Sequence, residues 1–391
     1  MNILILPSWY TSEENPLNGI FFKEQAIALK NKFIQRNNND KVFVAYLEEF
    51  GIRDIKKYIK REKNKVTDED GIMTIRTKFL RIPKLQRLNM LLGSRILRKT
   101  IIQFSNYLKI DFDLIHIHSA LNVGIFYSLS KLKIPYVITE HSTGYARNLI
   151  SSQRKKYLSN VFSNAKRVIA VGNGLAEEIH KYTSNNVDVI FNIVNNNIKI
   201  NRTCSLEKYC FTFFSLGLNA KKKGHDILLL AFQELILSGY NAKLIIAGLT
   251  DVEKEWLLSL VSDEKVLTCL ELKGKLNREC VFKYMSNCDC FSLVSRFETF
   301  GVVFAEAMYC GKPVIASRTG GPDSFVNEKN GISVDVSDVE ATTKSMQYMI
   351  ENVSKYDNNE IRQFAIDNFS EDVICNKLMN MYMEVIKNEK N

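Results

Sequence analysis

Two glutamates are separated by seven residues in the stretch SRFETFGVVFAEAMYCGKPVIAS, residues 295–317. Glu298 precedes a predicted helix, and Glu306 lies inside it, with Phe300 and Gly301 between them. A helix start offers free N–H donors and a partial positive charge, which suit a phosphate, and a glycine there lets the backbone approach a ligand closely. Either glutamate alone fits an ordinary helix-terminus or surface residue. The two together, with Phe-Gly between them, favour a ligand site.

The elements around these glutamates predict where such a site would lie. CDCFSLVS reads as a buried strand, RFET as a turn, and FGVVFAEAMYCG as a helix closed by Gly311 and followed by Pro313. Parallel α/β sheets bind ligands at the carboxyl ends of their strands. Glu298 therefore falls in a turn at the ligand-binding edge of a sheet.

Short β-rich runs alternate with amphipathic helical segments along the chain, which is typical of an α/β fold with parallel sheets. The pattern restarts near Phe211 after an Asn-rich stretch, and 391 residues exceed one ordinary domain. We predict domains over residues 1–200 and 201–369, and a C-terminal helix over 370–391 that packs back on the first domain. The predicted strands span residues 2–6, 41–46, 113–117, 135–139, 167–171 and 187–190 in the first domain, and 211–217, 242–248, 266–272, 288–295, 312–317 and 331–336 in the second.

The composition, with 46% hydrophobic and 25% charged residues, is that of a globular protein. The net charge of +10 arises from the first half of the chain. Eight cysteines are scattered without metal-ligand spacing, so we interpret Cys288 and Cys290 as buried thiols. The first residues carry no basic leader, and no window is apolar enough for a membrane span. We expect a cytoplasmic protein.

The segment around the two glutamates resembles the donor site of retaining, nucleotide-sugar-dependent glycosyltransferases of the GT-B fold, family 4. The similar segment extends through SRTGGPDSFVNEKNGISVDVSD. Other similar segments are GIFFKEQAIAL, DLIHIHSALNVG and VITEHS in the first half and SLGLNAKKKGHDILLLAF in the second. The resemblance implies two Rossmann-like domains facing across a deep cleft, the first binding an acceptor and the second a nucleotide-sugar donor.

The resemblance also implies roles for individual residues in donor binding. Lys223, after Gly217, would bind the donor diphosphate. Glu306 would hold the ribose hydroxyls, and Glu298 would contact the transferred sugar. The further implied donor contacts are Asn192 and the backbone of Thr299, Phe300 and Gly301.

In the first domain, the resemblance places His141 near the reacting sugar, where a loop histidine can orient a hydroxyl or donate to developing charge. Gly19 would let the first loop approach the donor or acceptor. His116 and His118 are two apart on a strand, so their side chains should face the same way. No third ligand for a metal is evident, so we assign His118 to the wall of the cleft.

The implied reaction transfers a sugar with retention to a saccharide or lipid-linked saccharide, as in bacterial surface polysaccharide synthesis. A fixed cation and a helix start would stabilise the leaving diphosphate, and the leaving oxygen would take the acceptor's proton. No Asp-x-Asp with acidic neighbours is present, so we expect no metal and no cofactor.

Several positions depart from the family pattern. Leu218 stands where an arginine often follows the glycine of the phosphate-binding turn, so Lys221 or Lys222 would have to supply that charge. VIFNIVNNN replaces the usual hinge, Gly172 stands for a common serine, and Asp323 stands for a glutamate. Donor affinity is the property that Leu218 puts in question.

Two alternatives remain beside the transferase. A nucleotide-sugar epimerase would use the same fold without an acceptor, and a catalytically silent binding protein would explain Leu218. A Rossmann dehydrogenase is excluded because LILPSWYTSEENPLNG has no Gly-x-Gly-x-x-Gly turn.

The basic segment of residues 81–109 predicts a helix with apolar positions at Leu85, Leu88, Leu92 and Ile96 among lysines and arginines. Such a helix can lie on an anionic membrane surface, although a solvated face on a core helix explains the pattern equally. The preceding segment, residues 52–66, adds further positive charge. No nucleic-acid motif accompanies this charge, so we expect no nucleic-acid partner.

Overall fold

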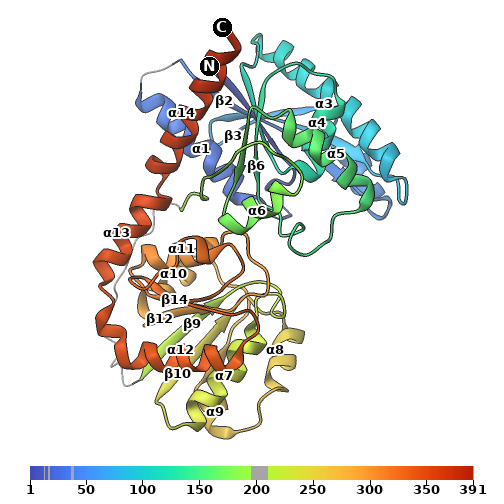
Figure 1. Cartoon of the computed structure of the whole chain (residues 1–391). Coiled ribbons are helices and arrows are strands. Elements are labelled where there is room, and N and C mark those ends of the chain that lie inside the picture. The colour runs from blue at the N-terminus through green and yellow to red at the C-terminus, as the bar shows by residue number, and fades with distance from the viewer. Residues whose placement is uncertain (13, 16–17, 37–38, 195–209, 391) are drawn as a thin grey trace. The chain divides into compact units, whose positions relative to one another are not determined.

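The computed structural model describes residues 1–12, 14–15, 18–36, 39–194 and 210–390, which form two compact units (Figure 1). Unit 1 comprises Met1–Ile193 and Glu371–Asn391, and unit 2 comprises Val194–Ser370. The boundary predicted near residue 200 falls in residues 195–209, outside the described residues. Each unit has its own sheet, so each is described by itself.

The sheet of unit 1 has the strand order β3-β4-β2-β1-β5-β6-β7-β8 and is parallel except for β3, which pairs antiparallel with β4. β1 lies between β2 and β5, with Ile3 opposite both Val42 and Leu114. It is buried on both faces, which explains its continuous apolar sequence. The strands are β1 (Asn2–Pro7), β2 (Lys41–Phe50), β3 (Lys65–Glu69), β4 (Ile72–Leu80), β5 (Leu114–His118), β6 (Tyr136–Glu140), β7 (Arg167–Ala170) and β8 (Val187–Val189).

Seven α-helices accompany this sheet among the described residues, one of them contributed by the C-terminal segment. They are α1 (Ile20–Gln35), α2 (Ile55–Lys60), α3 (Gln86–Leu108), α4 (Ile125–Leu129), α5 (Ser152–Ser163), α6 (Asn173–His180) and α14 (Glu371–Lys390), with the short helical turns η1 (Ile52–Asp54) and η2 (Ala120–Gly124). α3 buries Met90, Leu97, Ile101 and Phe104. The predicted stripe is therefore not its core face, because Leu85 and Leu88 are exposed.

Unit 2 contains an entirely parallel sheet with the strand order β11-β10-β9-β12-β13-β14. The strands are β9 (Phe211–Leu216), β10 (Ala242–Ala247), β11 (Leu270–Leu272), β12 (Cys290–Leu293), β13 (Val314–Ser317) and β14 (Gly331–Val334). The helices are α7 (His225–Leu237), α8 (Asp251–Leu258), α9 (Glu264–Thr268), α10 (Arg278–Asn287), α11 (Val302–Tyr309), α12 (Val339–Asn352) and α13 (Asn358–Phe369), with the turns η3 (Pro322–Ser324) and η4 (Val353–Lys355). Numbered from β9, this order is 3-2-1-4-5-6, the doubly wound arrangement of a Rossmann fold.

Two local predictions differ from the structure. The predicted strand over 266–272 is instead the end of α9 followed by the short β11, because Asp263 caps a helix by accepting from Lys265 N at 2.8 Å. The β3–β4 hairpin was not predicted. Its turn has Asp70 and Gly71 at positive φ, and Asp68 accepts a hydrogen bond from Gly71 N at 2.6 Å.

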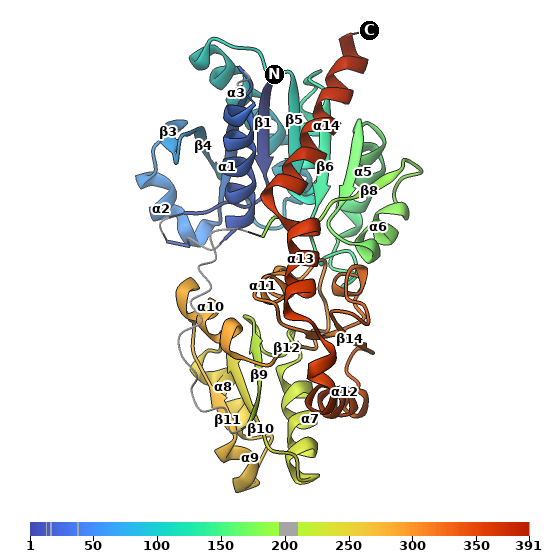
Figure 2. The same cartoon turned by 90° about the vertical axis from the view of Figure 1, so that its left-hand side faces the viewer.

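The C-terminal helix α14 belongs to unit 1, where it lies beside α1 (Figure 2). It contributes a buried apolar face to the core that contains Phe22 and Phe33. Lys32 and Arg36 of α1 contact Asp372 and Asn376 at its beginning. The chain thus returns to unit 1 after completing unit 2.

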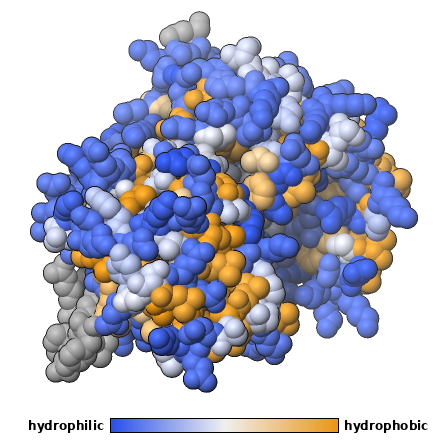
Figure 3. Space-filling model, turned by 60° about the horizontal axis from the view of Figure 1, so that its bottom comes forward, coloured by the Kyte–Doolittle hydropathy of each residue, from blue (hydrophilic) through white to orange (hydrophobic). Residues whose placement is uncertain are grey.

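The face shown in Figure 3 is mostly hydrophilic, with groups of hydrophobic residues between the hydrophilic ones. Within the described part of the chain, every helix is too short or too polar to cross a membrane.

The buried face of α14 should be required for the stability of unit 1. Leu378→Ala removes a side chain that is 1% exposed, whereas Met383→Ala removes one that is 43% exposed on the same helix. We expect a loss of about 2–5 kcal/mol for Leu378→Ala and less than about 0.5 kcal/mol for Met383→Ala. Thermal melting of the two variants would measure this, and equal melting temperatures would contradict the assigned packing.

Candidate active site

The strand order of unit 2 reverses between β9 and β12, which are hydrogen-bonded neighbours. At such a switch point, the loops that follow the two strands lead away in opposite directions and leave a crevice at the carboxyl edge. The loop after β9 carries Gly217 and Lys223, and the loop after β12 carries Glu298. Topology therefore brings together three residues that the sequence separates widely.

Lys223 and Glu298 form an ion pair at this switch point, with 2.5 Å between Nζ and Oε2. Both side chains are largely buried. Burial alone would raise the pKa of Glu298, but the charge and hydrogen bond of Lys223 outweigh it and lower that pKa. Glu298 is therefore an anion and a hydrogen-bond acceptor near neutral pH, with a cation fixed beside it.

Gly217 lets the Lys223 side chain lie across the end of β9. A Cβ atom at position 217 would lie 2.7 Å from Cγ of Lys223, closer than side-chain atoms approach each other. Any larger residue would push the lysine away from Glu298. The occurrence of Gly217 and Lys223 in one sequence motif thus has a steric explanation.

Arg296 and Asp226 hold the two loops together, although neither residue stands out in the sequence. The Arg296 guanidinium contacts both carboxylate oxygens of Asp226 at 2.8 Å and also donates to Lys221 O. The backbone N–H of Arg296 donates to Lys222 O at 2.9 Å. These bonds fix the segment that carries Lys223 against the segment that carries Glu298.

The helix start predicted near Gly301 is present as the N-terminus of α11. Gly301 is its N-cap at φ 86°, without a side-chain cap hydrogen bond. This left-handed conformation favours glycine. Phe300 is buried against Phe325 and Phe369, with ring centroids 5.3 and 5.5 Å away, so it anchors the turn. The Thr299 N–H donates to Glu298 Oε1 at 3.3 Å, which ties this turn to the carboxylate.

Glu306 is not a surface residue, which corrects one of the two alternatives considered for it. It is 8% exposed, and Oε1 lies 3.4 Å from the Arg278 guanidinium. The hydrophobic residues of α11 around it are buried.

The remaining residues predicted to bind the donor have different placements. Asn192 belongs to unit 1, between Phe191 and Ile193, which pack against its core. It is therefore not part of the unit 2 group. Leu218 is 60% exposed, and the charge of Lys222 contributes to the lowered pKa of Glu298. Of the two lysines proposed to replace the missing arginine, Lys222 is the better placed.

Unit 1 also gathers its predicted residues at a switch point, where β1 lies between β2 and β5. Gly19 is the N-cap of α1, in the left-handed conformation at φ 70°. His141 follows β6, and its ring lies 5.2 and 4.9 Å from those of Phe21 and Phe22 in the first turn of α1. His118 at the end of β5 approaches it, with 3.1 Å between Nδ1 and the Nε2 of His141.

Burial keeps this histidine cluster neutral. It lowers the pKa of His141 to about 3, with a further contribution from His116, and it holds the pKa of His118 well below its usual value. His118 has no exposed surface, so it does not form the predicted wall of a cleft. It contacts His141 from within the core instead. As predicted, His116 faces the same way as His118, with ring centroids 4.2 Å apart. His116 is held by Tyr382 of α14 and by Thr139.

Glu140, unremarked in the sequence, organises the loops that carry the histidines. Its carboxylate is fully buried and accepts hydrogen bonds from the backbone N–H groups of Ala120, His141 and Ser142 at 2.8–3.0 Å. The Tyr145 hydroxyl donates at 2.9 Å. Burial raises the pKa of Glu140, although these donors act in the opposite direction. Its position next to His141 in VITEHS was the signal that could have indicated this role.

In the described ranges, no group of three or more His, Cys, Asp or Glu residues is arranged to hold a metal ion. Cys288 and Cys290 are both buried free thiols, as predicted.

Comparison with known families identifies the fold and the chemistry. Residues 206–364 match the family described as glycosyl transferases group 1, and residues 59–197 match Glycosyltransferase Family 4. The chain belongs to the group 1, or family 4, glycosyltransferases. It has the GT-B fold of this glycosyltransferase family, with a Rossmann-like sheet in each unit.

Curated relatives of this glycosyltransferase include an uncharacterized glycosyltransferase of Methanocaldococcus jannaschii, 32% identical over 55% of this chain and 58% of that protein. Another is N-acetylgalactosamine-N,N'-diacetylbacillosaminyl-diphospho-undecaprenol 4-alpha-N-acetylgalactosaminyltransferase of Campylobacter jejuni. It is 24% identical over 62% of this chain and 68% of that protein. The first match thus spans less than two thirds of its relative.

Solved structures share the whole fold of the glycosyltransferase at low identity. Sucrose-phosphate synthase of Thermosynechococcus elongatus superimposes with a TM-score of 0.75 at 17% identity, covering 99% of this chain and 100% of that one. The Anabaena protein HepE in complex with UDP-glucose gives a TM-score of 0.69 at 18% identity, covering 98% and 100%.

The Lys223–Glu298 pair predicts a pH-dependent contribution to stability. Because the pKa of Glu298 is lowered in the folded chain, the contribution is present above the ordinary value of 4.5 and is lost as pH falls through the folded value. Glu298→Gln should therefore lower the melting temperature most near pH 7, and the difference from the unsubstituted protein should vanish in acid. Melting curves across this range would measure it, and a difference independent of pH would contradict the ion pair.

Proposed function

We propose that this glycosyltransferase transfers a sugar from a nucleotide-diphosphate sugar, bound by unit 2, to a saccharide or lipid-linked saccharide bound by unit 1. The observation that carries the proposal is the buried Lys223–Glu298 pair at the switch point of unit 2, beside the open start of α11. A cation, an anionic acceptor and free helix N–H groups in one crevice match a ligand with both phosphate and hydroxyl groups.

We propose complementary tasks for these groups. Lys223 and the N-terminus of α11 stabilise the charge that develops on the departing diphosphate. Glu298 accepts hydrogen bonds from hydroxyls of the transferred sugar, and Glu306 accepts from those of the ribose. His141, neutral at physiological pH, donates or accepts a hydrogen bond at the reacting sugar.

We infer that the transfer retains the anomeric configuration. The acceptor hydroxyl attacks from the face that the leaving diphosphate occupies, the sugar–phosphate bond breaks, and a phosphate oxygen takes the hydroxyl proton. No enzyme carboxylate then needs to act as a nucleophile, in contrast with retaining glycosidases. Because Lys223 and α11 supply the positive charge, the proposed reaction needs no metal.

The relatives support the proposed substrates and pathway. HepE is described in complex with UDP-glucose, and the Campylobacter relative is named for a diphospho-undecaprenol saccharide. We propose a role in bacterial surface polysaccharide synthesis in the cytoplasm, with peripheral contact at an anionic membrane.

The proposed membrane contact is supported by η1 and α2, whose residues are all at least partly exposed. Ile52, Ile55 and Ile59 project from this segment among lysines and arginines. β4 holds this segment in place, because Lys78 Nζ on β4 donates to Tyr58 O and Arg61 O at 2.8 Å. Exposed isoleucines beside basic residues suit an anionic bilayer surface.

Charge introduced on this face should weaken membrane binding. The double substitution Ile55→Glu and Ile59→Glu should reduce binding to vesicles of phosphatidylglycerol and phosphatidylcholine about tenfold or more, because it removes apolar contact and adds repulsion. Ile34→Glu, an exposed isoleucine on α1, is the matched control. Sedimentation with vesicles would measure binding, and equal binding by both variants would contradict the proposal.

The donor proposal is tested first by a thermal-shift screen of nucleotide sugars, because a ligand that binds the native state raises its melting temperature. With the donor identified, Glu298→Ala should lower transfer by about 100-fold or more. Glu255→Ala, an exposed glutamate on α8, should leave transfer unchanged. Full activity of Glu298→Ala would contradict the assigned role.

The same assay separates the two alternatives. Incubation with the donor alone would yield an epimer if the protein were an epimerase, and only slow hydrolysis if it is a transferase. Donor binding without transfer to any acceptor would indicate a silent binding protein.

A further inference from the structure

A cavity of about 490 Å³ lies within unit 1, on the side of α1 away from the histidine cluster. Thr11 and Ser12 of the first loop and Ile20 at the start of α1 form one wall. The opposite wall includes Thr67 of β3 and Arg76 of β4. Its volume lies in the range of small-molecule sites.

The first turn of α1 connects this cavity to His141. Ile20 lines the cavity, whereas the next two residues, Phe21 and Phe22, contact the His141 ring. Gly19, which begins the helix, is the residue expected to let the first loop approach a substrate. A ligand in the cavity would therefore be one helical turn from the proposed reacting centre.

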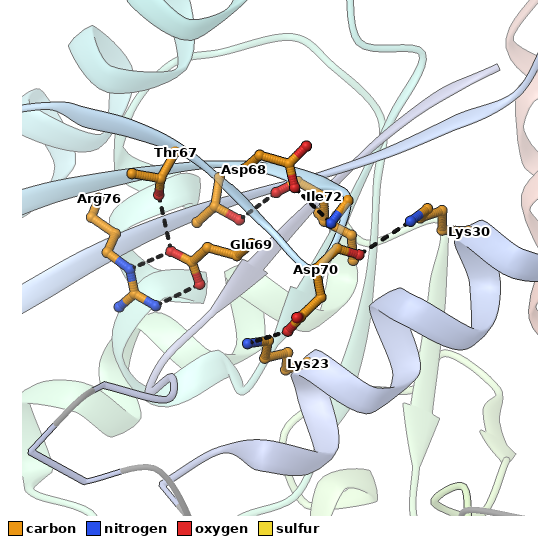
Figure 4. A network of polar contacts seen from close by, with 10 residues as sticks. Lys23, Lys30, Thr67, Asp68, Glu69, Asp70, Ile72 and Arg76 are labelled. Atoms are coloured by element: carbon orange, nitrogen blue, oxygen red, sulfur yellow. Dashed lines mark hydrogen bonds and ion pairs between the residues drawn. The ribbon is translucent and has the colours of Figure 1, made fainter.

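The charges around the cavity are paired with one another, as Figure 4 shows for its β3–β4 wall. Arg76 donates to both carboxylate oxygens of Glu69 at 2.7 and 2.8 Å, and Thr67 also donates to Glu69. Lys23 pairs with Asp70 at 2.6 Å. These partners fix the polar atoms of the wall without leaving an excess of positive charge.

The other end of the cavity follows the same pattern. Arg61 lies 3.5 Å from Glu48, and Glu62 and Lys65 add one charge of each sign. Phosphate and nucleotide sites present a surplus of cations or a helix start to the anion. This wall instead offers carboxylates and hydroxyls beside guanidinium groups, which complement the many hydroxyls of an uncharged sugar.

Tyr10 packs behind the Arg76 side of the cavity wall. Its side chain is 2% exposed, and its hydroxyl has no hydrogen-bond partner among the described residues. The Arg76 guanidinium lies 5.2 Å from the Tyr10 ring centroid. Burial raises the pKa of Tyr10, the charge of Glu69 raises it further, and that of Arg76 opposes the rise. The Tyr10 ring therefore supports Arg76, a lining residue, from within the core.

We propose that this cavity binds an uncharged saccharide portion of the acceptor, one or two sugar units long. The proposal rests on the proposed glycosyl transfer and specifies where unit 1 holds its acceptor and of which chemical class. The reacting hydroxyl would extend over the first turn of α1 toward His141. Glu69, Arg76 and Thr67 would orient the sugar that does not react.

Saturation-transfer NMR on the full chain tests this with uncharged disaccharides of glucose, galactose, mannose and N-acetylglucosamine, and with the phosphorylated monosaccharides. We expect at least one uncharged disaccharide to bind. Ser12→Trp, which fills the cavity, should weaken that binding at least tenfold, and Thr67→Val, which keeps the side-chain shape, should weaken it a few-fold. Gln86→Trp, at a separate cavity of about 270 Å³ in the same unit, should leave it unchanged.

Three results would overturn the proposal: no binding by any uncharged disaccharide, binding by phosphorylated sugars alone, or unchanged binding in Ser12→Trp. Thermal shifts with nucleotide sugars on Ser12→Trp should equal those of the unsubstituted protein, because the donor groups lie in unit 2. If donor binding fails in the unsubstituted protein, the proposed function fails while the saccharide result stands on its own.

Discussion

The reversal of strand order in each parallel sheet is the constraint on which both groups of functional residues depend. In unit 2, it brings the loops after β9 and β12 to one point, so that Lys223 and Glu298, 75 residues apart, form a buried ion pair. A buried charge is costly unless it is paired. The two residues therefore hold each other in place, and Arg296 and Asp226 fix the loops that carry them.

Unit 1 uses the same topological device for different chemistry. Its switch point collects three buried, neutral histidines, and the buried carboxylate of Glu140 holds the loops at the ends of β5 and β6. Tyr382 reaches this cluster from α14, which follows unit 2 in the chain. The histidines therefore depend on a segment that is synthesised last.

The sequence predicted the fold class and much of the unit 2 group, because these follow from local patterns. Alternating strands and helices indicate a parallel sheet, and the two glutamates flank a recognisable helix start. Arg296, Asp226 and Glu140 could not be identified in this way, because their importance comes from hydrogen bonds to segments distant in the sequence or to backbone atoms. Asn192 lies in unit 1, so the strand order of unit 2 does not bring it to the unit 2 group, and its predicted donor contact stays a prediction.

The local sequence pattern was also insufficient to predict the β3–β4 hairpin and the buried face of α3, because both depend on contacts with the sheet. β3, with the sequence KVTDE, is almost entirely polar, and the hairpin joins the sheet because β4 pairs with β2. In the predicted apolar stripe of α3, Leu85 and Leu88 are exposed and Leu92 and Ile96 are half-buried, whereas Met90, Leu97 and Ile101 fill the core. Which side of an amphipathic helix is buried depends on the sheet that it covers, and a single helix sequence does not contain that information.

A crystal structure of the protein with a bound nucleoside diphosphate would test the central claim most directly. The account predicts that the diphosphate contacts Lys223 Nζ and the N–H groups at the start of α11, with the ribose within hydrogen-bonding distance of Glu306. A nucleotide bound elsewhere, with the Lys223–Glu298 crevice empty, would contradict it.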